Sequence, residues 1–188
     1  MANQDAAFGF RPVAHLAGGT IRAREYKIAA NYNTAIYTGQ AVTAVTAGGI
    51  EICAVGAVVL GVFYGVSYTD PTTGKPTWSK YYPASTNASD LKAMVYDDPY
   101  IVFEAQHDGT GTAAMNFGGH DFVGTGGSTI TGRSTQEIDT SEVDTSGQFK
   151  QIGISTDPDN SDTSSANCNA YVVFNTGEHT WKLTTALS

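Results

Sequence analysis

Short runs of β-forming residues, separated by turn residues, recur along this chain and constrain its fold more than any other feature. They begin at Ile21 and are broken by turn signals such as Gly48-Gly49 and Asp97-Asp98-Pro99. Runs of this kind between Gly, Pro and Asp are typical of strands joined by tight turns. Only residues 112–119 favour a helical turn, and just 15% of the residues are charged. We therefore predict an all-β fold with little helix.

The most apolar run marks the expected core. Residues 58–70, "VVLGVFYGVSYTD", read as a strand covered on both faces, with Gly61 and Gly65 permitting bends or bulges. The longest apolar stretch, Ile52–Val66, contains three glycines and falls short of the roughly 20 residues that a membrane-spanning helix needs. We interpret it as two buried strands and expect no membrane partner.

Charge and cysteine content argue against several classes of protein. The chain has 10 Lys and Arg residues and 18 Asp and Glu residues, which gives a formal net charge of −8 and disfavours binding to nucleic acid. No basic and apolar leader opens the sequence, so we expect the chain to stay where it is synthesised. Cys53 and Cys168 lack the spacing of a zinc site or a disulfide framework, and we expect two free thiols.

The first twenty residues follow neither a strand nor a helix period. Phe8, Phe10 and Val13 are apolar islands, and Pro12 argues against a regular strand through the segment. We predict an extended N-terminal arm over residues 1–20 and a single β-rich body over 21–188. The arm could be a loosely packed chain end, or it could order by placing Phe8 and Phe10 in pockets on a neighbour.

The stretch 97–109, "DDPYIVFEAQHDG", combines four acidic residues with a histidine around an apolar run. Strand alternation puts Glu104, Gln106 and Asp108 on one face. A metal or acid–base site there would need distant partners, either His120-Asp121 or Glu178-His179. We favour a solvent-facing polar edge instead.

Other chemical motifs are weak. Asp157, Asp159 and Asp162 lie in a long polar loop without the Gly and closing Glu of a calcium loop. The glycines of 124–132 lack the lysine and following helix of a phosphate cradle. The four histidines, His15, His107, His120 and His179, suggest no catalytic triad. We predict no enzyme, no catalytic residues, no metal and no cofactor.

Six segments carry a resemblance to a known family. They are "FGFRPV" (8–13), "IYTGQAV" (36–42), "YYPAS" (81–85), "DDPYIVFEAQHDG" (97–109), "GSTITGRSTQEID" (127–139) and "NTGEHTW" (175–181). In this succession the chain resembles the capsid decoration, or cement, proteins of tailed bacteriophages. The polar loop 157–169 lies outside the resembling segments, and its role stays open.

The resemblance implies a β-barrel or β-sandwich body, a homotrimer, and attachment to the major capsid protein on the outer capsid surface of the virion after synthesis in the host cytoplasm. Such a protein would cement contacts between capsid subunits. The partner-binding residues would then be those of the arm: Phe8, Phe10, Arg11, Pro12 and Val13. The alternative is another virion component, such as a head fibre, tail or adsorption module that binds host glycans through Trp78, Tyr81, Tyr82 and Trp181.

Overall fold

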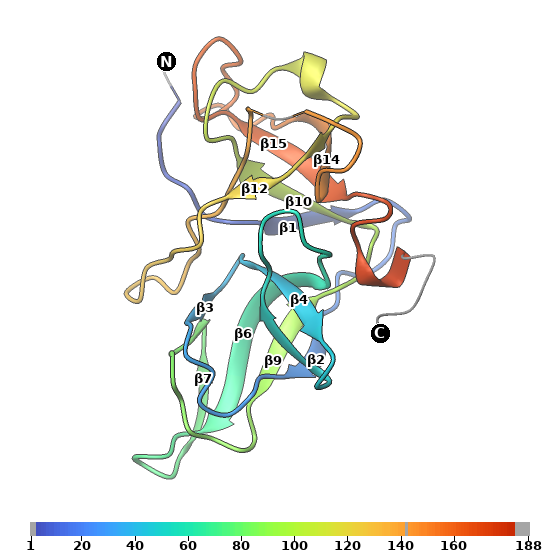
Figure 1. Cartoon of the computed structure of the whole chain (residues 1–188). Coiled ribbons are helices and arrows are strands. Elements are labelled where there is room, and N and C mark those ends of the chain that lie inside the picture. The colour runs from blue at the N-terminus through green and yellow to red at the C-terminus, as the bar shows by residue number, and fades with distance from the viewer. Residues whose placement is uncertain (1–2, 142, 183–188) are drawn as a thin grey trace.

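The computed structural model describes residues 3–141 and 143–182, and this part of the chain is almost entirely β-structure arranged in two lobes (Figure 1). We call residues 24–96 the barrel lobe, and residues 10–15 together with 101–174 the sheet lobe. Two 3-10 helices, η1 (Ala113–Met115) and η2 (Thr180–Lys182), are the helical elements among the described residues. The predicted all-β fold is confirmed.

Five strands close the barrel. They are β2 (Arg24–Lys27), β4 (Ala41–Val45), β5 (Gly49–Ile52), β6 (Gly61–Thr69) and β9 (Lys92–Tyr96). Their order is β4-β5-β2-β9-β6, and β6 pairs again with β4 to complete the ring. The strand β7 (Pro76–Ser79) extends the sheet beside the far half of β6. A two-stranded sheet of β3 (Ile36–Tyr37) and β8 (Tyr81–Tyr82) lies beside it.

The apolar run predicted as a doubly covered strand is β6, the longest strand among the described residues. Its register against β9 shifts between Phe63 and Gly65, which confirms a bulge at the second glycine. A Cβ at Gly65 would lie 2.7 Å from the Trp78 ring, so only glycine fits beside that indole. Phe63 and Val66 point into the apolar interior of the barrel.

The sheet lobe is an open, antiparallel five-stranded sheet. Its order is β1 (Arg11–His15), β10 (Ile101–Gln106), β15 (Asn169–Phe174), β14 (Phe149–Ile154) and β11 (Gly119–His120). The short pair β12 (Phe122–Val123) and β13 (Glu137–Ile138) covers it. Because β1 and β10 are neighbours in space, the whole barrel lobe is an insertion between two adjacent strands of this sheet.

One apolar cluster joins the two lobes. Phe10, Phe103, Phe149 and Phe174 of the sheet lobe pack in the same cluster as Val59 and other residues at the top of the barrel. Phe10 stacks on Phe149 with ring centroids 4.1 Å apart and an interplanar angle of 11°. The lobes therefore share a core as well as a chain.

The predicted division into an arm at 1–20 and a single body at 21–188 differs from this arrangement. Residues 11–15 are a strand of the sheet lobe, and the body has two lobes. Pro12 doesn't prevent the strand, because it lies on an edge strand whose register shifts between Pro12 and Ala14. A proline is tolerated at an edge, where its missing N–H breaks no ladder, and at a bulge.

Two further expectations concern the membrane and the thiols. Among the described residues, no helix is long and apolar enough to span a bilayer. Cys53 and Cys168 are both free and buried, as predicted. Burial raises the pKa of the Cys53 thiol to about 12, so it stays protonated at neutral pH.

Candidate functional site

The five residues predicted to bind a partner lie at the outer edge of the sheet lobe, but they are not equally accessible. Arg11 and Val13 are exposed, while Phe8 and Pro12 are half-buried. Phe10 is 1% exposed and belongs to the shared core, so its prediction as a surface anchor is wrong. Gly9 makes this burial possible: its φ of +75° turns the chain inward, and a Cβ there would lie 2.5 Å from the Gly39 carbonyl oxygen.

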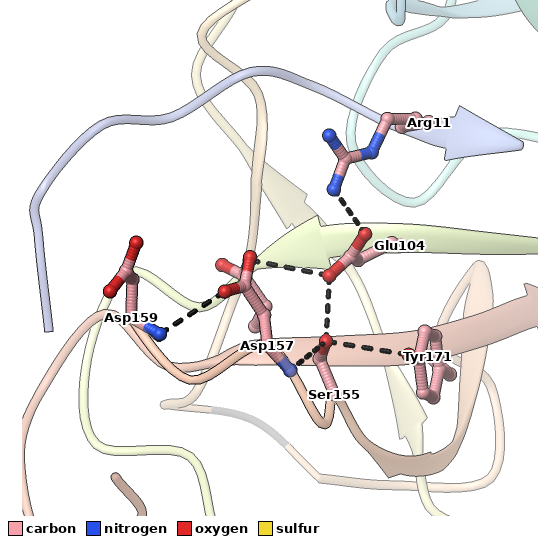
Figure 2. A network of polar contacts seen from close by, with 7 residues as sticks. Arg11, Glu104, Ser155, Asp157, Asp159 and Tyr171 are labelled. Atoms are coloured by element: carbon pink, nitrogen blue, oxygen red, sulfur yellow. Dashed lines mark hydrogen bonds and ion pairs between the residues drawn. The ribbon is translucent and has the colours of Figure 1, made fainter. Parts of the chain in front are cut away.

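Arg11 forms an ion pair with Glu104 on the neighbouring strand β10, and this carboxylate is the centre of a polar network (Figure 2). The Ser155 hydroxyl donates to Glu104 Oε1 at 2.7 Å, and Asn169 Nδ2 lies 3.4 Å from the same oxygen. The Glu104 side chain is only 5% exposed, whereas that of Arg11 is 54% exposed. These partners give the buried carboxylate a structural role, because a buried charged group needs hydrogen-bonded partners.

Ser155 extends the network towards the loop 155–168, which connects β14 to β15. Its oxygen accepts a hydrogen bond from the Asp157 N–H, and Asp157 Oδ1 accepts one from the Asp159 N–H. Ser155 Oγ also lies 3.4 Å from the Tyr171 hydroxyl, and this contact lowers the pKa of Tyr171. The arrangement fixes the start of the loop against Glu104 (Figure 2).

The N-terminal segment, residues 3–9, is fastened to the same loop. The Gln106 amide accepts from the Ala6 N–H at 2.9 Å and donates to the Gln4 carbonyl at 2.8 Å. Asn160 Nδ2 donates to that carbonyl as well, at 2.9 Å. Asn3 donates to the Asp162 carbonyl and accepts from the Asp162 N–H. The loop that lay outside the family resemblance therefore has a structural role: it holds the start of the chain.

This covering overturns the expectation of a solvent-facing polar edge on β10. Glu104 is 4% exposed and Gln106 is 1% exposed, because the N-terminal segment and loop 155–168 lie over them. Asp108 alone of the three is exposed, and its carboxylate accepts from the Thr140 N–H and hydroxyl. Strand alternation put Glu104 and Gln106 on one face of β10 but could not show what covers that face.

His107 points to the opposite side of β10 from Glu104 and Gln106. Its ring nitrogens contact the Cys168 carbonyl at 3.0 Å and Gln151 Oε1 at 2.9 Å. Burial lowers the pKa of His107, which favours the neutral imidazole. Glu104, His107 and Asp108 therefore face three different environments and form no common acid–base constellation.

Of the distant partners considered for that stretch, His120 lies beside it, with its ring edge-on to that of His107 and the centroids 6.5 Å apart. His120 contacts the Asp139 carbonyl, and Asp121 Oδ1 accepts from the Gln148 N–H. His179 packs on the Phe174 ring with centroids 4.5 Å apart, and burial lowers its pKa to about 4. Among residues 3–141 and 143–182, no group of three or more His, Cys, Asp or Glu side chains could hold a metal ion.

The acidic loop residues cap their own turns. Asp157 accepts from the Asp159 N–H, while Asp162 accepts from the Ser164 N–H and hydroxyl. The hydrogen bond from the Ser164 hydroxyl is the main reason that the pKa of Asp162 is lowered. These carboxylates serve local Asx turns and do not converge on one point.

The four aromatic residues considered for glycan binding do not gather. Tyr82 is fully buried and donates to the Tyr32 carbonyl, and Tyr81 stacks on Tyr37. Trp78 is exposed on the barrel lobe beside Tyr64. Trp181 is exposed on η2, where its indole donates to Asp97 at 3.0 Å.

Comparison with known proteins adds no relative. No protein-family model matches the chain, no curated protein matches it, and no solved structure matches it.

Sequence reasoning missed Ser155 and Asn160, which organise the site, and it assigned Gln106 to a solvent-facing edge although the residue is buried. Each is a neutral polar residue in a chain rich in such residues, so its type carries no signal. The one available clue was the length of the loop, since connections without structure of their own are seldom so long unless they have a role.

Proposed function

We propose that this chain is a structural protein of a bacteriophage virion that binds the outer surface of the capsid as a trimer and cements contacts between major capsid protein subunits. The observation that carries the proposal is the edge strand β1. It pairs with β10 on one side and has no strand partner on the other among the described residues. An exposed strand edge is a template for binding another chain.

The side chains along this edge suit a protein partner. Val13 is 41% exposed, and Leu16, directly after the end of β1, is 57% exposed. The strand is held firmly at its back by Phe10 in the core and by the Arg11–Glu104 ion pair. A surface that is already ordered loses little conformational entropy on binding.

The physical task of a cement protein also fits the charge and the architecture. Packaged DNA pushes a shell outward, and contacts across capsomer boundaries must break before the shell opens. A trimer gripping several subunits gains from effective concentration, so contacts of modest strength become durable. A net charge of −8 favours a position outside the shell, away from DNA phosphates.

Binding of the purified chain to capsids that lack it tests the proposal, with Val13→Asp as the informative variant. Val55 offers a matched control, since it is an equally apolar residue, 54% exposed, in the turn between β5 and β6. We expect the wild type and Val55→Asp to bind to saturation at a copy number close to that of the capsid protein. Val13→Asp should bind at least about tenfold more weakly, which corresponds to about 1.4 kcal/mol.

Failure of the wild type to bind capsids would reject the proposed function. Normal binding of Val13→Asp would leave the function in place and remove β1 from the interface.

A further inference from the structure

A cavity of about 250 Å³ opens where the N-terminal segment and β1 meet the top of the barrel lobe. Three separate parts of the chain form its wall: residues 8–12, the β6 and β9 strands with the turn at 38–39, and the loop 124–136. The cavity therefore lies between the lobes, next to the edge strand of the proposed capsid interface.

The lining of this cavity is mainly aromatic. Phe63 of the barrel cluster lines it and is fully buried, and Tyr96 packs against Tyr64 with ring centroids 5.3 Å apart. Phe8 forms the opposite wall, with the Arg11 guanidinium 4.8 Å from the centre of its ring. A hollow of this size and composition accommodates a large apolar side chain.

The charged residues at the cavity are both arginines, Arg11 and Arg133. Arg11 is neutralised by Glu104, but Arg133 is exposed and forms no ion pair among the described residues. No Asp or Glu lines the cavity, although acidic residues outnumber basic ones 18 to 10 in the chain. A guanidinium in these surroundings favours a carboxylate from a partner.

The lining also distinguishes a protein segment from a saccharide. Saccharide recognition needs several polar side chains aimed at hydroxyl groups, yet no Asn, Gln, Asp or Glu lines this cavity. The Thr38 hydroxyl, its one neutral side-chain donor besides the tyrosines, donates to the Tyr64 carbonyl at 2.7 Å and contacts the Lys80 carbonyl. The polar capacity that remains at the cavity is that of the two tyrosine hydroxyls and the arginines, which are too few to match the hydroxyl groups of a saccharide.

We propose that this cavity receives an aromatic or large aliphatic side chain from a surface segment of the major capsid protein, and that Arg133 pairs with a carboxylate beside that side chain. The inference rests on the proposed function and specifies the chemistry of the partner. A side chain inserted between the lobes contacts both of them, so it fixes their relative position as it binds. A side chain that is buried at the centre of an interface, with an ion pair beside it, supplies much of the binding free energy of that interface.

The test measures binding to capsids lacking the protein, with Arg133→Glu as the main variant and Arg22→Glu as its control. Arg22 is also exposed and forms no ion pair among the described residues, so its reversal makes the same change in net charge. We expect Arg22→Glu to bind within about twofold of the wild type and Arg133→Glu to bind at least about tenfold more weakly. Arg133→Lys should lie between them, because lysine cannot form the bidentate pair.

Tyr64→Ala is a second variant that removes an apolar wall and leaves the charge unchanged. It should also weaken capsid binding, and thermal unfolding of each variant checks that the fold is retained. If Arg133→Glu and Tyr64→Ala bind as the wild type does, the cavity inference is overturned and the proposed function stands. If no form of the protein binds, the proposed function and this inference fail together.

A second copy of the chain is the competing occupant. In that case Arg133→Glu would change the oligomeric state measured by light scattering while the affinity of each assembled form for capsids stayed the same. That result would overturn the assignment to the capsid protein.

Discussion

The barrel lobe fills its interior with apolar side chains, whereas the sheet lobe buries amides, imidazoles and a carboxylate as well. The buried cluster of the barrel consists of Ile, Val, Leu, Ala and aromatic residues. The sheet lobe and its loops bury several polar side chains: Glu104, Gln106, His107, Gln151 and Asn169.

This difference in buried side chains indicates how each lobe is stabilised. A closed ring of strands satisfies its own backbone and needs little from side chains. The open sheet depends on the N-terminal segment and loop 155–168 to satisfy its buried polar groups, since an unpaired group would cost about 1–3 kcal/mol. The barrel lobe therefore needs fewer side-chain partners of this kind than the sheet lobe, although the two lobes share one apolar cluster.

Phe10→Ala should reduce stability more than any other variant proposed here, and its unfolding tests whether the two lobes unfold in one transition. Phe10→Ala removes a ring that stacks on Phe149 and meets Phe122 edge-on, so it should lower the free energy of unfolding by about 3–5 kcal/mol. Because Phe10 shares a cluster with barrel residues, we expect a single transition in urea followed by fluorescence and by circular dichroism. Phe117→Ala, at a side chain that is 76% exposed, should change stability by about 0.5 kcal/mol or less. Two separate transitions would show that the shared cluster does not couple the lobes.

The next effect compares a buried ion pair with an exposed one. Glu104→Ala leaves Arg11 and the Ser155 hydroxyl without their acceptor and should cost about 1–3 kcal/mol in equilibrium unfolding. Glu25→Ala breaks the Lys92–Glu25 pair of the barrel lobe, in which both side chains are more than half exposed, and should cost about 0.5 kcal/mol or less. Equal costs for the two variants would contradict the structural role assigned to the network.

A smaller, local effect concerns the fastening of the N-terminal segment. Asn160→Ala removes donors to the Gln4 and Asn167 carbonyls, so amide hydrogen exchange within residues 3–6 should quicken roughly tenfold. Exchange in the barrel strands should not change. The matched variant Asn87→Ala loses an exposed contact to Asn31 in the barrel lobe and should leave the segment protected. Unchanged exchange at residues 3–6 in Asn160→Ala would mean that the segment is held by other contacts.

A pH dependence of stability also belongs to the sheet lobe. Burial, with Asp5 and Asp108 nearby, raises the pKa of Glu137 from 4.5 to about 7. Between these values the folded protein keeps a proton that the unfolded chain releases, so this group's contribution to stability falls as pH rises from about 4.5 to 7. Glu137→Gln should abolish that decline in unfolding measured across this range, whereas Glu51→Gln in the barrel lobe should retain it. A wild-type slope that persists in Glu137→Gln would assign the effect to another group.

The sequence could predict the features that depend on local pattern. The β-rich class and the bulge at Gly65 followed from residue type and spacing. The apolar run Tyr100–Phe103 likewise predicts a core strand, and the structure has it from Ile101 on, with Tyr100 49% exposed before the strand begins. The burial of Phe10 could not be predicted, because it depends on a turn at Gly9 and on packing against Phe122 and Phe149, which follow it by more than a hundred residues. The burial of Glu104 and Gln106 likewise depends on a loop that follows them by about fifty residues and on a segment that precedes them by about a hundred.

The insertion of the barrel lobe between β1 and β10 also sets an order of events during synthesis. β1 leaves the ribosome first, but its partner strand begins at Ile101, after the entire barrel has emerged. Pairings between distant segments close slowly, and chains generally fold unit by unit as they are made. The barrel can therefore form while Phe10 is still unburied and the β1 backbone is still unpaired. During that interval the nascent chain exposes a strand that can pair with a neighbouring copy.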